Sequence, residues 1–101
     1  MLCALTVRKL KPGAEEDFRS RFIDASEEAE FPPGWRRFYA LRNVEDEQEV
    51  ITFGFFDGTL EELRQGQRDL DYESRRAELE ELIDAVGADG IYEVFEERTM
   101  G

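Results

Sequence analysis

Residues 50–56 of this 101-residue chain read Val-Ile-Thr-Phe-Gly-Phe-Phe, a run without a charged side chain. Successive side chains of an extended strand point to opposite faces, so this run presents two faces. One face carries Ile51, Phe53 and Phe55. The other face carries Val50, Gly54 and Phe56. Because both faces are apolar, we predict that this strand lies at the centre of a sheet and is covered on both sides.

Three more segments have the composition of strands. Residues 2–7 are short and apolar, residues 35–43 alternate in period two with aromatic side chains, and residues 91–97 form the last candidate. A polar run at residues 45–49 lies between two of these strands. It lacks the ligand spacing and the glycine of a calcium loop, so we interpret it as a solvated hairpin turn.

The first helical region follows the turn at Lys11-Pro12-Gly13 and stops at Pro32-Pro33-Gly34. Between these limits, apolar residues recur at spacings of three or four, which is the period of one helical stripe. They are Ala14, Phe18, Phe22, Ala25 and Ala29. Three acidic residues at positions 15–17 suit the positive N-terminal end of a helix.

The second helical region begins at Thr59-Leu-Glu-Glu62, which matches a capping box. We expect a break near Gly66 and a longer piece from about Asp69 to Val86, ended by Gly87. The order of elements is then strand, helix, strand, strand, helix, strand. This is the split βαβ pattern of a ferredoxin-like α+β fold, a four-stranded antiparallel sheet with both helices on one face. We expect one such domain over residues 1–101.

Composition excludes several classes of function. The chain has 13 basic and 25 acidic residues and a net charge of −12, and such a polyanion repels nucleic acid and anionic membranes. It contains no histidine, which removes histidine-based triads, metal ligands and haem ligation. The single cysteine, Cys3, forms no internal disulfide, and no apolar run approaches the roughly 20 residues of a membrane span. We expect a cytoplasmic protein without a metal or cofactor.

Helices on one face of the sheet leave the other face bare. Since the central strand is apolar on both faces, the bare face would be a large apolar patch, and such a patch usually marks a partner. A second copy that packs sheet against sheet about a two-fold axis is the simplest partner. We therefore predict a homodimer.

Several turns and their spacing resemble one known family, the dimeric α+β barrel superfamily, and its antibiotic-biosynthesis-monooxygenase-like branch in particular. They are Lys11-Pro12-Gly13, the helix with Phe18, Pro32-Pro33-Gly34-Trp35, and Phe53-Gly54-Phe55-Phe56-Asp57-Gly58. The resemblance spans the whole chain. It implies a homodimer whose two sheets close a barrel, with a small cavity between each sheet and its own helices. Some members oxidise aromatic polyketides without metal or flavin, some degrade haem, and many have no known activity.

The chain departs from parts of this family. Haem-degrading relatives rely on a histidine ligand, and this chain has none, so the resemblance does not extend to that activity. The cofactor-independent oxygenases use asparagine, tryptophan, tyrosine and arginine to orient an acidic phenol and stabilise its anion. The same residue types occur here, but their spacing does not match a family motif residue by residue.

Candidate ligand-pocket residues lie on the strand at residues 35–43 and at the start of the long helix. By strand parity, Trp35, Arg37, Tyr39 and Asn43 share one face. This face is either a pocket wall, where rings stack on a flat ligand and polar groups hold an oxyanion, or part of a dimer interface. Tyr72 either reaches into a cavity beneath the helix or lies on the helix surface.

The sequence is compatible with three hypotheses about function. The first is a small dimeric protein of this fold without an assignable activity. The second is a cofactor-independent monooxygenase or isomerase that acts on a small aromatic or phenolic substrate. The third is a non-catalytic accessory protein that binds a small aromatic ligand. No residue is identified as catalytic.

Overall fold

The computed structural model describes residues 1–24 and 32–101. The strands are β1 (Leu2–Leu10), β2 (Trp35–Asn43), β3 (Asp46–Phe56) and β4 (Ile83–Glu93). The helical segments are α1 (Glu15–Phe18), a π-helical turn η1 (Arg19–Asp24), α3 (Leu60–Asp69), α4 (Tyr72–Leu79) and a 3₁₀ turn η2 (Glu80–Leu82). No helix in the described ranges is long and apolar enough to cross a membrane.

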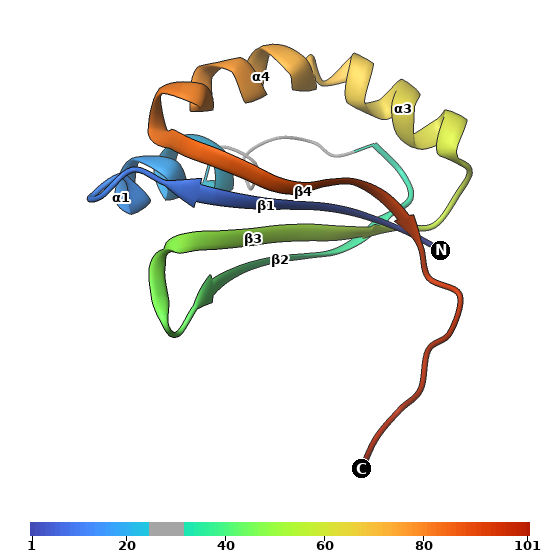
Figure 1. Cartoon of the computed structure of the whole chain (residues 1–101). Helices are drawn as coiled ribbons and strands as arrows, with labels where there is room; N and C mark the ends of the chain where they lie inside the picture. The colour runs from blue at the N-terminus through green and yellow to red at the C-terminus, as the bar shows by residue number, and fades with distance from the viewer. Residues whose placement is uncertain (25–31) are drawn as a thin grey trace.

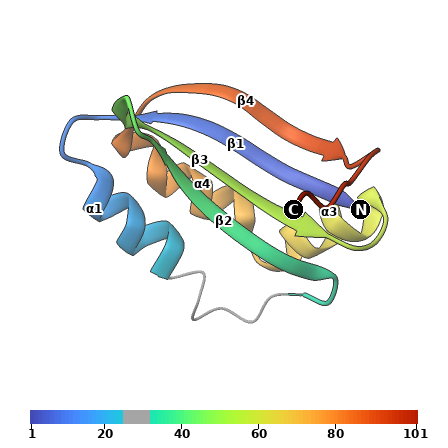
Figure 2. The same cartoon turned by 90° about the horizontal axis from the view of Figure 1, so that it is seen from below.

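The four strands form one antiparallel sheet in the order β2-β3-β1-β4. The helices lie on one face of this sheet, and the opposite face carries no helix of the described chain (Figures 1 and 2). This arrangement confirms the predicted ferredoxin-like α+β fold. The central position of residues 50–56 is also confirmed, because β3 pairs with β2 on one side and with β1 on the other.

The strand that follows α4 begins earlier than predicted. Residues 83–86 were expected at the end of a helix and residues 91–97 in the last strand, yet β4 runs from Ile83 to Glu93. The i, i+3 spacing of apolar residues continues past Leu79, but β1 offers a free ladder edge there and the backbone pairs with it. Gly87 lies beside Val7 in this pairing, within β4 and not at a helix end.

Other boundaries also differ. β3 begins at Asp46, so of the polar run at residues 45–49 only Glu45 lies outside the strands, in a turn that it shares with Val44. Gln48 within this strand donates to the Leu10 carbonyl at 2.9 Å, which ties the extension to β1. The second helical region continues through Gly66, which packs against Pro32, and breaks at Asp71 in a left-handed conformation.

The first helical region begins as predicted after Ala14, and its later residues Ala25 and Ala29 lie outside the described residues. Phe18 of this region joins the hydrophobic core, which gathers side chains from both ends of the chain. The core cluster consists of Leu10, Ala14, Phe18, Val50, Leu79 and Leu82. It ties α1, α4 and η2 to the sheet at one end of the helical layer.

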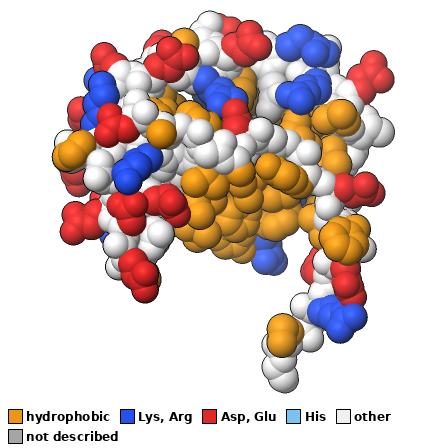
Figure 3. All heavy atoms as spheres, in the orientation of Figure 1, with side chains coloured by type: hydrophobic (Ala, Val, Ile, Leu, Met, Phe, Trp, Pro, Cys, Tyr) orange, Lys and Arg blue, Asp and Glu red, His pale blue; other side chains and the backbone are white. Residues whose placement is uncertain are grey.

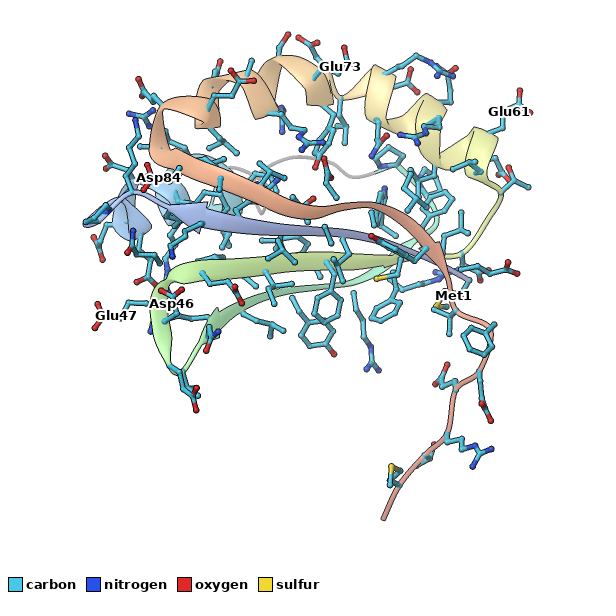
Figure 4. The ribbon with its side chains drawn as sticks, in the orientation of Figure 1. Met1, Asp46, Glu47, Glu61, Glu73 and Asp84 are labelled. Carbon is cyan, nitrogen blue, oxygen red and sulfur yellow. The ribbon has the colours of Figure 1, made fainter. Side chains whose placement is uncertain are left out.

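The bare face of the sheet is apolar. Figure 3 shows a continuous hydrophobic surface on the side of the sheet away from the helices, and Figure 4 shows side chains projecting from that side. We name this surface the open face. Strand register assigns to it Cys3, Leu5, Val7, Tyr39, Leu41, Ile51, Phe53 and Phe55. The rings of Tyr39 and Phe53 stack with centroids 5.1 Å apart, and those of Phe53 and Phe55 meet edge to face at 5.7 Å.

Candidate functional site

A cavity of about 710 Å³ lies between the helix-covered face of the sheet and the helical segments η1, α3 and α4. All four strands contribute to its wall. This volume lies within the range of small-molecule sites, roughly 300–1,000 Å³. The sheet side supplies Thr6 of β1 and Thr52 of β3, and the helical side supplies Phe22 and Tyr72. The cavity therefore combines aromatic walls with hydroxyl groups.

Trp35 lines this cavity because of an irregularity in β2. The register pairs Trp35 with Phe56 but Arg37 with Phe55, so Arg36 is an extra residue in a β-bulge. The bulge turns the indole toward the helices, where it meets the Phe56 ring at 5.2 Å and lies over Gly54. Contrary to strand parity, Trp35 and Tyr39 lie on opposite faces of the sheet.

Of the other candidates from β2, Arg37 also belongs to the cavity lining, whereas Tyr39 and Asn43 do not. Arg37 pairs with Phe55 in the strand register, and Tyr39 stacks on Phe53, which places Tyr39 on the open face. Asn43, at the end of the strand, donates to the Glu49 carboxylate at 3.3 Å and does not line the cavity. The structure thus divides the four predicted residues among the cavity, the open face and the hairpin.

Tyr72 lies on the wall of the cavity at the start of α4, one of the two positions that the sequence left open. Its ring is half-buried and lies 5.8 Å from the guanidinium carbon of Arg76. Arg76 in turn donates to the Asp89 carboxylate at 2.7 Å. The phenol therefore stands beside a cation whose charge is already shared with a carboxylate.

Arg8 is a feature of this site that the sequence analysis missed. Its side chain is only 1% exposed, and its guanidinium carbon lies 5.6 Å from the Phe18 ring centroid and 5.1 Å from that of Phe22. Its Nη1 donates to the Thr52 hydroxyl at 2.8 Å, while Nη2 has no hydrogen-bond partner among the described residues. Burial lowers the pKa of Arg8, and the nearby Tyr72 and Asp89 oppose this effect.

One signal in the sequence could have found Arg8. It shares strand parity with Thr6 and Leu10, which places it on the helix-covered face of a strand that begins in an apolar run. A charged residue on such a face is almost never fully buried unless it is paired. The polar residues Thr6 and Arg8 on this face indicate that the space under the helices is not a plain hydrophobic core.

Asp89 connects β4 to both sides of the cavity. It accepts from the Thr6 hydroxyl at 3.0 Å and from Arg76 at 2.7 Å. Burial alone would raise the pKa of Asp89, but the hydrogen bonds from Arg76 and Thr6 outweigh it and hold the pKa below its usual value of 3.8. The carboxylate is therefore ionised in the folded protein and linked to two partners.

We expect Asp89→Asn to lower the free energy of unfolding by about 1 kcal/mol at pH 7, because charge-assisted hydrogen bonds are weakened in a partly exposed position. Since the folded-state pKa is lowered, this contribution is present above pH 3.8 and is lost as the pH falls through the folded-state value. Urea unfolding at pH 7 and below pH 3.8 measures both effects. Glu47→Gln, which removes a charge from the exposed hairpin, is the control. An equal loss for Asp89→Asn at both pH values would contradict the prediction.

The cavity wall is rich in arginine although the protein is strongly acidic. Besides Arg37, its lining includes Arg21, Arg36, Arg64, Arg75 and Arg76, against the acidic residues Glu73, Glu78 and Asp89. Arg64 and Arg75 form no salt bridge with any residue in the described ranges. The local charge is thus opposite in sign to the net charge of −12, a distribution that attracts anions into the cavity.

Solved structures with this arrangement of elements are similar over nearly the whole chain. A protein provisionally named as an antibiotic biosynthesis monooxygenase from Deinococcus radiodurans superposes with a TM-score of 0.81 at 10% identity, covering 100% of this chain and 99% of that one. SnoaB, a cofactor-independent oxygenase from Streptomyces nogalater, superposes with a TM-score of 0.77 at 17% identity, covering 95% of this chain and 94% of that one. Rv0793 from Mycobacterium tuberculosis superposes with a TM-score of 0.75 at 18% identity, covering 97% of this chain and 98% of that one.

The chain has the fold of the antibiotic-biosynthesis-monooxygenase-like proteins. The predicted resemblance is therefore confirmed at the level of the fold. No protein-family model matches the sequence, and neither does any curated protein. The chain's own cavity is lined by threonine and arginine, and the buried Arg8 is hydrogen-bonded to one of these threonines.

Proposed function

We propose that the protein is a homodimer that binds a small, flat aromatic molecule in the cavity between its sheet and its helices. The observation that carries this proposal is the composition of the cavity wall, which offers the rings of Trp35, Phe22 and Tyr72 together with hydroxyl and guanidinium donors. Flat aromatic ligands gain from stacking on such rings, while a few polar groups fix their orientation. The single cysteine fits a protein that works in a reducing cytoplasm.

The open face supports the dimer in this proposal. None of the side chains that strand register places between residues 3–7, 37–41 and 51–55 of this face is acidic, although the chain has 25 acidic residues. Tyr39 and Leu41 are 40% and 44% exposed, respectively, and such exposure of large apolar side chains to water is unfavourable. A two-fold contact would bury the aromatic cluster of Tyr39, Phe53 and Phe55 without bringing acidic groups of the two copies together.

A second candidate function is cofactor-independent oxygenation of the bound aromatic molecule. The similarity to the cofactor-independent oxygenase SnoaB favours it. The hydroxyl and guanidinium groups at the cavity would stabilise negative charge that develops on a phenolic substrate. Because the chain has no histidine, proton transfer would depend on other groups.

The binding proposal is tested through Trp35, the single tryptophan of the chain, whose indole N–H gives one cross-peak in a ¹⁵N-labelled sample. Titration with 2-naphthamide, a flat neutral probe, is expected to shift this cross-peak in a saturable way. Ala4→Leu, which fills the cavity from β1, is expected to abolish the shift, while Ala85→Leu on the exposed part of β4 leaves it unchanged. An indole cross-peak that does not move at millimolar probe would overturn the proposal.

A further inference from the structure

The guanidinium of Arg8 carries a charge that no described carboxylate pairs with in a salt bridge, although Tyr72 and Asp89 lie near enough to oppose the effect of burial on its pKa. It is 1% exposed, forms no salt bridge with a described residue, and leaves Nη2 without a hydrogen-bond partner among them. Burying a charge is costly unless it is paired and hydrogen-bonded. An anion in the adjoining cavity would complete the surroundings of this buried cation.

The nearest carboxylate does not fill this role. Both oxygens of Asp89 are engaged, one by the Thr6 hydroxyl at 3.0 Å and the other by Arg76 at 2.7 Å. Two guanidinium groups, that of Arg8 on β1 and that of Arg76 on α4, therefore lie near one carboxylate, that of Asp89. One positive charge remains in excess at this place.

Thr52 connects this buried charge to the cavity. Its hydroxyl oxygen accepts from Arg8 Nη1 at 2.8 Å, and Thr52 itself lines the cavity beside Thr6, its partner in the β1–β3 register. Because the oxygen is used as an acceptor from Arg8, the hydroxyl hydrogen is available for donation elsewhere. A hydrogen bond received from a cation polarises the hydroxyl and strengthens it as a donor.

We propose that the sheet side of the cavity, at Thr52 and Arg8, is an anchoring site for an ionised acidic group of the ligand. Thr52 donates its hydroxyl hydrogen to an anionic oxygen, and Arg8 acts as a positioning residue that orients the hydroxyl and supplies the compensating charge. This inference rests on the proposed binding function and adds the chemical class of the ligand, an aromatic acid bound as its anion. The arginine-rich wall of the cavity attracts such an anion from solution.

A carboxylate and a phenolate offer the same anionic oxygen chemistry. The test compares 2-naphthoate, a carboxylate, with 2,4-dinitro-1-naphtholate, a phenolate at neutral pH, and with neutral 2-naphthamide. Isothermal titration calorimetry on the full chain measures the three dissociation constants. We expect at least one of the two anions to bind roughly ten-fold or more tightly than the amide, as a charge-assisted hydrogen bond implies. The anion that binds more tightly identifies the kind of acid.

Thr52→Val removes the hydroxyl and keeps the shape of the side chain. We expect this variant to lose most of the preference for the anion while its affinity for 2-naphthamide stays within about two-fold, because it removes the donor to the anionic oxygen and the acceptor that links this donor to Arg8. Thr99→Val, the same change in the exposed C-terminal segment, serves as the matched control. Arg8→Gln is expected to abolish the preference and Arg8→Lys to retain part of it, since lysine restores the charge but not the fork geometry. If the Arg8 variants fail to fold, Thr52→Val still decides the question.

The outcomes separate the two proposals. If 2-naphthamide binds as tightly as both anions, or if Thr52→Val leaves the preference unchanged, the anchoring site is refuted while the binding function stands. If none of the three probes binds, the proposed function fails, and the anchoring site fails with it. A preference that disappears in Thr52→Val but not in Thr99→Val supports the anchoring site.

Discussion

Phe53→Asp is expected to raise the dissociation constant of the proposed dimer by at least about 100-fold, so that the variant sediments as a monomer at micromolar concentrations. Phe53 lies at the centre of the open face, between Tyr39 at 5.1 Å and Phe55 at 5.7 Å. A carboxylate at this position would be buried without a partner in the dimer, and the two copies related by the two-fold axis would bring like charges together. Sedimentation velocity over a dilution series measures the effect.

Val44→Asp is the matched control for this experiment. Val44 is also apolar and is 99% exposed, but it lies in the turn between β2 and β3, outside the open face. We expect this variant to remain a dimer. If the native chain sediments as a monomer, or if both variants dimerise as well as the native chain does, the assignment of the open face as the dimer interface is wrong.

Leu63→Ala is expected to lower the free energy of unfolding by about 2–5 kcal/mol, the usual cost of truncating a fully buried leucine. Leu63 has no exposed surface and is the buried leucine of α3, the helix that lies over the sheet (Figure 1). The variant also tests the cavity, because a loss of packing in α3 loosens the wall that carries Arg64. Chemical denaturation followed by circular dichroism measures the change.

Leu60→Ala in the same helix is the control for Leu63→Ala. Leu60 is 50% exposed, so its truncation is expected to change the free energy of unfolding by less than about 0.5 kcal/mol. Comparable losses for both variants would mean that α3 does not pack on the sheet through Leu63. A loss confined to Leu63→Ala supports the packing of the helical layer described above.

The candidate site was predictable only where local pattern decides position. Tyr72 lies on the cavity wall, which was one of the two hypotheses for this residue. It does so because it stands at the start of a helix that covers the sheet. Trp35 faces the cavity because Arg36 is an extra residue in the pairing of β2 with β3. The alternation of side chains along a regular strand does not predict this bulge. Tyr39 and Asn43 were grouped with Trp35 by the same parity and lie elsewhere.

The end of α4 is another feature that local sequence does not predict. Leu79, Leu82, Ile83 and Val86 continue a helical spacing, and nothing in their local sequence forbids a helix as far as Gly87. The helix ends at Leu79 because β1 presents unpaired backbone groups along its edge, and the segment from Ile83 onward satisfies them. This competition involves residues more than 70 positions apart, so it is not visible in a local window.

By itself, the sequence determined the order of the elements, the two apolar faces of the central strand, the capping box at Thr59 and the acidic net charge. Each of these depends on side-chain type and on a local period of 2.0 or 3.6 residues. The tertiary structure alone decided that a bulge turns Trp35 inward, that β4 replaces the end of a helix, and that Arg8 is buried on Thr52 beside an arginine-lined cavity. These features depend on which backbone edges and side chains meet across the sheet, and such meetings are set by packing between segments that are distant in the chain.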